Sequence, residues 1–233
     1  MKLKLTPLYI LSFLFLLFLV HEVHDWSHAL MARVVSPCWG PRIFDGWDFC
    51  TGYKVSSGQR ALALIAGPLI NYLLLWIGYT LLDPERPLNE QSMGCSLVFA
   101  ALPLNGLLAA FDGGGDLTNT IRWFQQHGPA TNHRLVTIMG LALVIALTVP
   151  PLLRAFLSLP GYKGRFLVFP VLFLIPGLLD HLLVGKWLNA WLITPDMTQA
   201  HAYALVGGWG GFLLLGLLLT WQHLEDMMSE LSL

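Results

Sequence analysis

The sequence predicts an all-α, polytopic membrane protein with about six transmembrane helices. Of its 233 residues, 55% are hydrophobic and only 12% are charged, and the mean hydropathy is +0.63. Soluble domains carry about 25% charged residues, so this composition is typical of a chain whose helices lie in lipid. The net charge of −1, with Lys and Arg scattered along the chain, offers no basic patch for nucleic acid. We therefore expect the lipid bilayer, and not nucleic acid, as a partner.

The first apolar segment carries an unusual cluster of polar side chains. Residues 5–20 contain no charge, and although the basic start resembles a signal peptide, no small-residue cleavage site follows. We expect a retained transmembrane helix that continues to about Val34. Its second half contains a cluster of ionisable residues, among them His21, His24, Asp25 and His28. Residues three and four apart share a helix face, and such groups are costly at membrane depth, so we predict a functional zinc site.

The segment 35–60 is expected to be a loop with short strands, because it is rich in Pro, Gly and aromatic residues. It contains Cys38 and Cys50, which could form a disulfide if the loop faces an oxidising compartment. The three cysteines, including Cys95, have no CxxC spacing and build no disulfide framework on their own, so we favour free thiols.

Five further apolar runs have about the 20-residue length that spans the hydrocarbon core of a bilayer: 61–82, 93–111, 135–153, 166–185 and 202–221. Residues 116–133 are polar and are expected to form a loop or an interfacial helix. Asp180 and His181, in the fifth span, are expected to form a local polar pair or an interfacial helix end. If six spans alternate, the Lys and Arg residues divide six against seven between the two sides, so the positive-inside rule predicts no orientation.

Two overlapping frames of the polar cluster fit the zinc-binding pattern H-E-x-x-H. In that pattern two histidines one turn apart bind the metal, and the intervening carboxylate activates a water molecule. In the first frame His24 and His28 are the ligands, and Asp25 stands at the position of the usual Glu. In the rival frame Glu22 keeps the usual residue type, but His21 and Asp25 become the ligands.

Three motifs resemble those of the site-2 protease family of intramembrane zinc metalloproteases. HDWSHALMAR at 24–33 resembles the family's H-E-x-x-H motif and the residues after it, AGPLIN at 66–71 resembles its A-G-P-x-x-N motif, and FDGG at 111–114 resembles its L-D-G-G motif. The match covers roughly residues 17–116, on three successive membrane segments. This order of motifs favours the first frame.

The resemblance implies a role for five residues. His24, His28 and Asp112 would bind Zn²⁺ and leave a fourth position for water, which is the mark of a catalytic zinc site. Asp25 would accept the proton of that water. Asn71 would hydrogen-bond the substrate backbone or the oxyanion.

The sequence departs from the family pattern near these residues. Asp25 is one carbon shorter than the usual Glu, which removes about 1.5 Å of reach, the length of a C–C bond. His21 is an extra imidazole one turn before His24, and it could be a fourth ligand, a group that orients a ligand, or a proton carrier. Asp116 stands where a basic or apolar residue is commoner in the family.

The resemblance also implies a domain organisation and an activity. Residues 1–116 would form a three-helix core with the metal site, and 117–233 three further transmembrane helices, within a single membrane domain. The expected activity is hydrolysis of peptide bonds in membrane-embedded or membrane-delivered substrates. The alternative is a non-proteolytic zinc-binding relative that acts on a membrane protein partner as an assembly, chaperone or regulatory subunit. A third hypothesis is a transporter or di-metal enzyme that uses His21 and Asp116 as further ligands.

Overall fold

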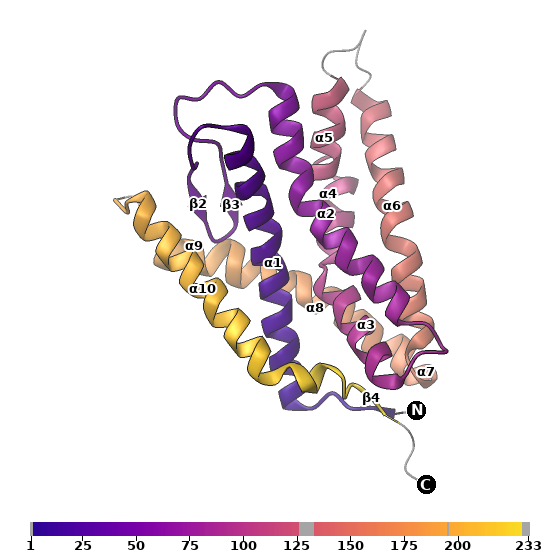
Figure 1. The fold of residues 1–233 in the computed structure, drawn as a ribbon. Helices are drawn as coiled ribbons and strands as arrows, with labels where there is room; N and C mark the ends of the chain where they lie inside the picture. The colour runs from indigo at the N-terminus through magenta and orange to yellow at the C-terminus, as the bar shows by residue number, and fades with distance from the viewer. Residues whose placement is uncertain (1, 126–132, 195, 230–233) are drawn as a thin grey trace.

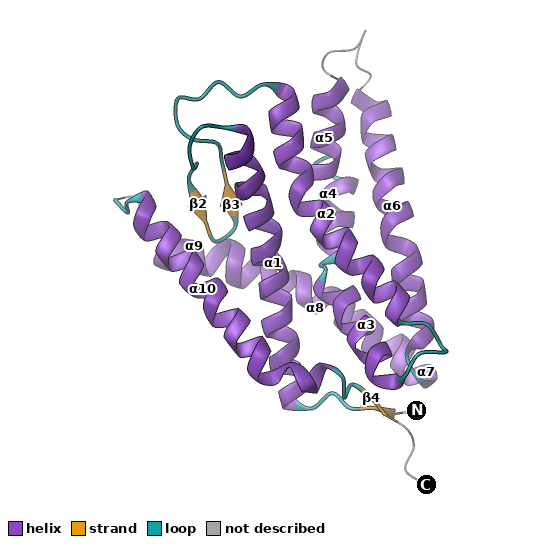
Figure 2. Ribbon diagram, viewed as in Figure 1, coloured by secondary structure: helices purple, strands orange, loops and turns teal. Residues whose placement is uncertain are grey.

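The fold of the chain is a bundle of membrane-length helices. The computed structural model describes residues 2–125, 133–194 and 196–229 (Figure 1). Within them, six helical segments are long and apolar enough to cross a membrane: 7–35, 57–81, 88–111, 134–158, 165–192 and 199–224. Strands in the described residues are only two residues long (Figure 2). The predicted class, an all-α polytopic membrane protein, is therefore confirmed.

Helix α1 (Pro7–Val35) is the long helix that carries the histidines. It begins where the Thr6 hydroxyl accepts a hydrogen bond from the Tyr9 amide at 3.1 Å, and Pro7 occupies the first turn, where its missing N–H costs nothing. At about 1.5 Å per residue, its 29 residues span about 43 Å, which exceeds the roughly 30 Å hydrocarbon core. The helix therefore extends beyond the hydrocarbon region.

A short β-hairpin lies between the first two spans, beside the C-terminal half of α1 (Figure 1). Strand β2 (Arg42–Ile43) pairs antiparallel with β3 (Gly46–Trp47). Helix α2 (Ser57–Leu81) follows, and it begins with a capping box in which Ser56 and Gln59 satisfy each other's backbone amides. The predicted loop with short strands is thus confirmed.

The third span consists of two helices, α3 (Leu88–Ala100) and α4 (Pro103–Phe111). They are separated at Leu102, whose φ of 53° and ψ of 49° place it in the left-handed region, uncommon for a residue other than glycine. Helix α5 (Asp116–Gln125) follows and packs against α2 and the fourth span. The N-terminal part of the predicted polar segment is therefore a helix, and residues 126–132 lie outside the described part.

The second half of the chain completes the bundle. It contains α6 (His133–Ser158), α7 (Gly161–Lys163), α8 (Phe169–Asp180), α9 (Asn189–Leu192) and α10 (Gln199–Thr220). Two π-helical segments, Gly164–Val168 and His181–Leu188, flank α8, and a 3₁₀ turn, Trp221–Leu224, follows α10.

The two ends of the described chain meet on one side of the bundle. Strand β1 (Lys2–Leu3) pairs antiparallel with β4 (Met228–Ser229), and the Lys4 amide donates to the Met227 carbonyl at 2.8 Å. The largest buried apolar cluster joins residues from both halves of the chain, among them Tyr9, Phe99, Leu159, Leu172 and Leu224. Residues 1–116 therefore share a core with the later helices.

Candidate metal centre

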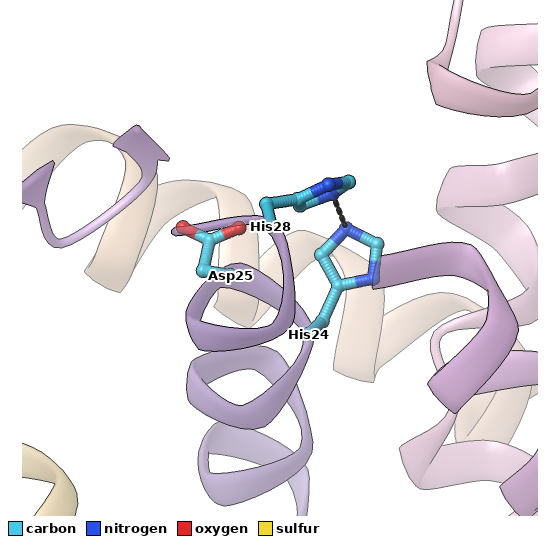
Figure 3. Close-up of side chains that lie close together, drawn as sticks. All are labelled: His24, Asp25 and His28. Atoms are coloured by element: carbon cyan, nitrogen blue, oxygen red, sulfur yellow. Dashed lines mark hydrogen bonds between the residues drawn. The ribbon is translucent and has the colours of Figure 1, made fainter. Parts of the chain in front are cut away.

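His24 and His28 lie one turn apart on α1 and turn their rings toward each other (Figure 3). Their Nε2 atoms are 3.1 Å apart, and the ring planes are nearly perpendicular, with centroids 4.6 Å apart. Two neutral imidazoles that meet through Nε2 share at most one proton, so at least one of the two nitrogens presents a lone pair.

The tautomer of His28 is fixed by its other nitrogen. His28 Nδ1 lies 2.7 Å from the carbonyl oxygen of Ala63 on α2, an acceptor only, so Nδ1 carries the proton and donates it. The neutral ring therefore presents a lone pair at Nε2. Trp47 of the hairpin stacks on the ring with an interplanar angle of 15°, and the residue is only 1% exposed. A carbonyl that holds Nδ1 in this way is typical of metal-binding histidines.

The carboxylate that reaches both imidazoles belongs to Asp116, the first residue of α5. Its Oδ2 lies 3.5 Å from His24 Nε2 and 3.3 Å from His28 Nε2. The backbone turns before this helix at Gly113 and Gly115, whose φ values of 70° and 77° suit glycine because it has no Cβ. This turn places Asp116 beside His24 and His28.

Asp112, predicted as the third metal ligand, is not brought to the histidines. It is exposed at the end of α4, where its backbone amide donates to the Leu108 carbonyl, and it does not line the cavity at the histidines. The glycine turn instead carries the chain back to α1 four residues later, at Asp116. Asp116, and not Asp112, is therefore the carboxylate that the structure brings to His24 and His28.

The three donor atoms have the spacing of one face of a tetrahedron. Zinc bonds of about 2.0–2.1 Å to nitrogen and oxygen place tetrahedral ligand atoms about 3.3 Å apart. The observed separations are 3.1, 3.3 and 3.5 Å. The residues present therefore fit a tetrahedral ion and leave a fourth position for water or substrate.

Burial and the histidines act in opposite directions on Asp116. Burial alone would raise the pKa of its carboxyl group, but when His24 and His28 are protonated, their hydrogen bonds and positive charges outweigh that cost. With the histidines in that form, the pKa of Asp116 lies below its usual range. Positive charge at the histidines thus keeps the carboxylate ionised.

Asp25, predicted as the general base, faces away from the pair of imidazoles and toward the hairpin (Figure 3). A carboxylate oxygen of Asp25 still lies within 4.8 Å of a ring nitrogen of both His24 and His28. Its Oδ2 is 3.0 Å from Nη1 of Arg42, whose Nη2 lies 3.1 Å from Glu22 Oε2. Asp25 is therefore near the metal position and is also held by a buried guanidinium.

Arg42 is a buried cation that the motif analysis did not select. Its side chain is fully buried, it donates to the Gly46 carbonyl at 3.0 Å, and it lies over the Trp26 ring at 5.9 Å. Burying a guanidinium is costly unless carboxylates and carbonyls accept its protons. The pairing of Glu22 and Asp25 with Arg42 explains why α1 can carry two extra acids in this position.

His21 lies on the same face of α1, one turn before His24 and two turns before His28, but its ring has other partners. Its Nδ1 lies 2.9 Å from Asp180 Oδ1 on α8, and its Nε2 lies 3.2 Å from the Phe44 carbonyl in the hairpin turn. Asp180 is buried and also accepts from Asn105 Nδ2 at 3.2 Å. The expected local pairing of Asp180 with His181 is thus wrong, because Asp180 points into the bundle toward His21. His181 is exposed.

Helix α2 supplies the wall opposite the histidines. A Cβ at Gly67 would overlap His28 Nε2 and lie 2.8 Å from His24 Cε1, so only glycine allows the backbone this close. Pro68 and Asn71, from the same motif, line the cavity. The Oδ1 atom of Asn71 is buried and has no hydrogen-bond partner within the described residues, so it is available to a ligand.

The site opens into a cavity of about 400 Å³, a volume typical of ligand pockets. Side chains from seven of the elements surround it, including His21, His24, Asp25, His28, Asn71 and Asp116. The structure therefore brings every predicted site residue to one cavity except Asp112.

A disulfide closes the loop that covers this site. Cys38 and Cys50 are bonded, so the preference for free thiols was wrong for these two residues, whereas Cys95 is free and buried. The loop between them carries Arg42 and Trp47, which contact Asp25 and His28. The bond therefore holds the hairpin against the candidate metal centre.

Three functional residues could not be selected from the motif alone: Arg42, Asp45 and Asp180. Each lies at least 14 residues from the nearest of these histidines in the sequence, and each reaches the polar residues of α1 only through the packing of the hairpin or α8. Asp180 was visible as an acid within an apolar run, which is the one signal that could have indicated it. No protein-family model, curated protein or solved structure matches this chain.

Proposed function

We propose that this protein is an intramembrane zinc metallopeptidase, with His24, His28 and Asp116 as the metal ligands. The observation that carries the proposal is the triangle of donor atoms at 3.1, 3.3 and 3.5 Å, which matches one face of a tetrahedral zinc site. Three protein ligands and an open fourth position are the arrangement of hydrolytic zinc sites, whereas structural zinc sites are closed by four ligands.

The side chains around this triangle supply the remaining parts of a hydrolytic site. Zinc, when bound, acts as a Lewis acid and lowers the pKa of a coordinated water toward neutrality. Asp25, within 4.8 Å of both histidines, accepts the proton of the attacking water and delivers it to the leaving amine. The unpartnered Oδ1 of buried Asn71 accepts a hydrogen bond from a backbone N–H of the substrate, which orients the peptide.

The surroundings of the cavity favour a substrate that lies in the membrane. His24, His28 and Asn71 belong to membrane-length helices, and the cavity walls combine the polar groups of the site with apolar side chains such as Leu75, Leu102 and Val144. A peptide bond within a helix is shielded because its carbonyl accepts an intrahelical hydrogen bond. The substrate is therefore an extended or unwound segment of a membrane-embedded or membrane-delivered protein.

A second function, a non-proteolytic zinc protein, is favoured by the contact between Arg42 and Asp25. The guanidinium lies 3.0 Å from Asp25 Oδ2 and so occupies an oxygen that a general base would need for the proton of water. In that case the site would stabilise the protein or dock a membrane protein partner, in an assembly, chaperone or regulatory role.

The experiment that separates the two functions is a cleavage assay with purified protein in liposomes. A panel of transmembrane peptides is incubated with four samples. These are the wild type, chelator-treated wild type, chelator-treated wild type reloaded with zinc, and the His28→Ala variant. The peptidase proposal requires cleavage that chelation abolishes, zinc restores and His28→Ala lacks. Zinc retention by the wild type without cleavage of any peptide would leave the non-proteolytic function in its place.

A further inference from the structure

The environment of His21 is unusual because acceptors face both of its ring nitrogens. Nδ1 lies 2.9 Å from Asp180 Oδ1, while Nε2 faces the Phe44 carbonyl at 3.2 Å and the carboxylates of Asp25 and Asp45 at 3.9 Å each. When Nδ1 donates to Asp180, a neutral ring presents a lone pair at Nε2 to three oxygen atoms. Such an arrangement is repulsive unless Nε2 also carries a proton or a metal ion takes the place of that proton between Nε2 and these oxygens.

The carboxylates around His21 outnumber the positively charged side chains beside them. Glu22, Asp25, Asp45 and Asp180 meet here, whereas the guanidinium of Arg42 supplies a single positive charge to Glu22 and Asp25. Asp25 is 6% exposed, and its Oδ2 accepts no well-aligned hydrogen bond although Arg42 lies 3.0 Å away. Buried carboxylates without sufficient partners are costly, so the cluster calls for further positive charge.

We propose that His21, Asp25 and Asp45 form a second divalent metal site beside the one at His24, His28 and Asp116, with Asp25 between the two. A ring nitrogen of His21 and one oxygen from each of the two acids already lie within 4.8 Å of one another. One imidazole nitrogen with carboxylate and carbonyl oxygens suits a first-row transition-metal ion such as Mn²⁺ or Zn²⁺.

The surrounding elements hold His21 and the Phe44 carbonyl in place but allow Asp45 to move closer to His21. Asp180 orients His21 through Nδ1, as carboxylates commonly do for metal-binding histidines. The turn that carries the Phe44 carbonyl is held by a 2.9 Å hydrogen bond from the Phe44 amide to Asn189. Asp45 has room to adjust, because its side chain is 49% exposed at the tip of the hairpin. Closing its 3.9 Å separation from His21 Nε2 to the roughly 3.3 Å between metal ligands requires a shift of about half an ångström.

The position of Asp25 links the two sites. Figure 3 shows one of its carboxylate oxygens on the side of His28 and the other directed toward the hairpin. A carboxylate can bridge two metal ions through its two oxygens, and two ions about 3.5–4 Å apart are a recurrent arrangement in hydrolytic enzymes. With the second site empty, Asp25 is free to act as the general base, whereas with the second site filled Asp25 binds both ions. Metal binding at the second site can therefore be tested without peptidase activity.

The test is the metal content of the full-length protein purified in detergent, stripped with a chelator and reloaded with excess Zn²⁺. We expect two ions per chain in the wild type, and one in Asp45→Asn and in Asp116→Asn. Asp48→Asn is the matched control, because Asp48 lies on the same loop and accepts its hydrogen bond from the amide of Phe49, outside the cluster. It should retain two ions.

Reloading with Mn²⁺ provides a second measurement that does not rely on stoichiometry. Two ions bridged by Asp25 should give a spin-coupled electron paramagnetic resonance spectrum, and Asp45→Asn should convert it to the six-line spectrum of an isolated ion. One ion per chain in the wild type, lost in Asp116→Asn but unchanged in Asp45→Asn, would overturn the second site and leave the zinc peptidase proposal intact. No ion in any variant would overturn both.

Discussion

Asp116 Oδ2 lies 3.3 Å from His28 Nε2, although 88 residues separate them in the sequence. This contact joins the first helix of the bundle to the short helix that follows the third span. It depends on two features: the left-handed glycines that turn the chain before Asp116, and Gly67, which lets α2 approach the imidazoles. The candidate metal centre is therefore assembled from three separate segments.

The first prediction concerns the third ligand. Asp116→Ala should remove one donor of the tetrahedral set and weaken zinc binding at this site as strongly as His28→Ala. Asp112→Ala should leave zinc affinity unchanged, because Asp112 is exposed and does not line the cavity. Competition with a chromophoric chelator measures the affinity of each variant. A loss of zinc in Asp112→Ala but not in Asp116→Ala would restore the assignment that the motif suggests.

The second prediction concerns the general base. Asp25→Asn should lower peptidase activity about 10²–10⁴-fold, the usual contribution of general acid–base catalysis, while zinc remains bound at His24 and His28. Glu22→Gln is the matched control, because it removes a carboxylate from the same Arg42 ion-pair network but leaves Asp25 in place. Rates of peptide cleavage and thermal unfolding are measured for both. Equal losses of activity in the two variants would mean that the Arg42 network, and not proton transfer, is responsible.

The third prediction tests the close approach of α2 to α1. Gly67→Ala should destabilise the protein by about 1–3 kcal/mol, the usual cost of overpacking, and should impair zinc binding because the new methyl group overlaps the His28 ring. Gly58→Ala, in the first turn of the same helix, meets nothing within 4 Å and should be neutral or slightly stabilising. Thermal unfolding with and without zinc distinguishes the two. Normal zinc affinity in Gly67→Ala would contradict the described packing.

The fourth prediction concerns orientation. Because disulfides persist in oxidising compartments, the Cys38–Cys50 loop should face the periplasmic, lumenal or extracellular side. The paired strands β1 and β4 place both ends of the described chain on one side of the bundle. Because the first span separates this side from the Cys38–Cys50 loop, both ends should face the reducing compartment. A reporter that is active only in the cytoplasm should therefore be active when it is fused to either end of the chain. Labelling of Cys38 or Cys50 by a maleimide in unreduced native membranes would contradict this orientation.

The fold class, the approximate positions of the spans and the pairing of His24 with His28 could be predicted from the sequence alone. Runs of about 20 apolar residues can satisfy their backbone in lipid only as helices or as closed barrels, so the spans follow from composition and length. His24 and His28 are one turn apart, and helical periodicity alone brings them to one face of α1. These are local properties, which a linear pattern specifies.

The distant groups that complete the site could be identified only from the tertiary structure. Both Asp112 and Asp116 follow the third span, and only the backbone rotation at Gly113 and Gly115 selects the second of them. Arg42 reaches Asp25 because the hairpin folds back along α1, and Asp180 reaches His21 because α8 crosses behind it. Contacts of this kind depend on turn geometry and on the packing of whole helices. Neither produces a periodic sequence pattern that would mark the residues in contact.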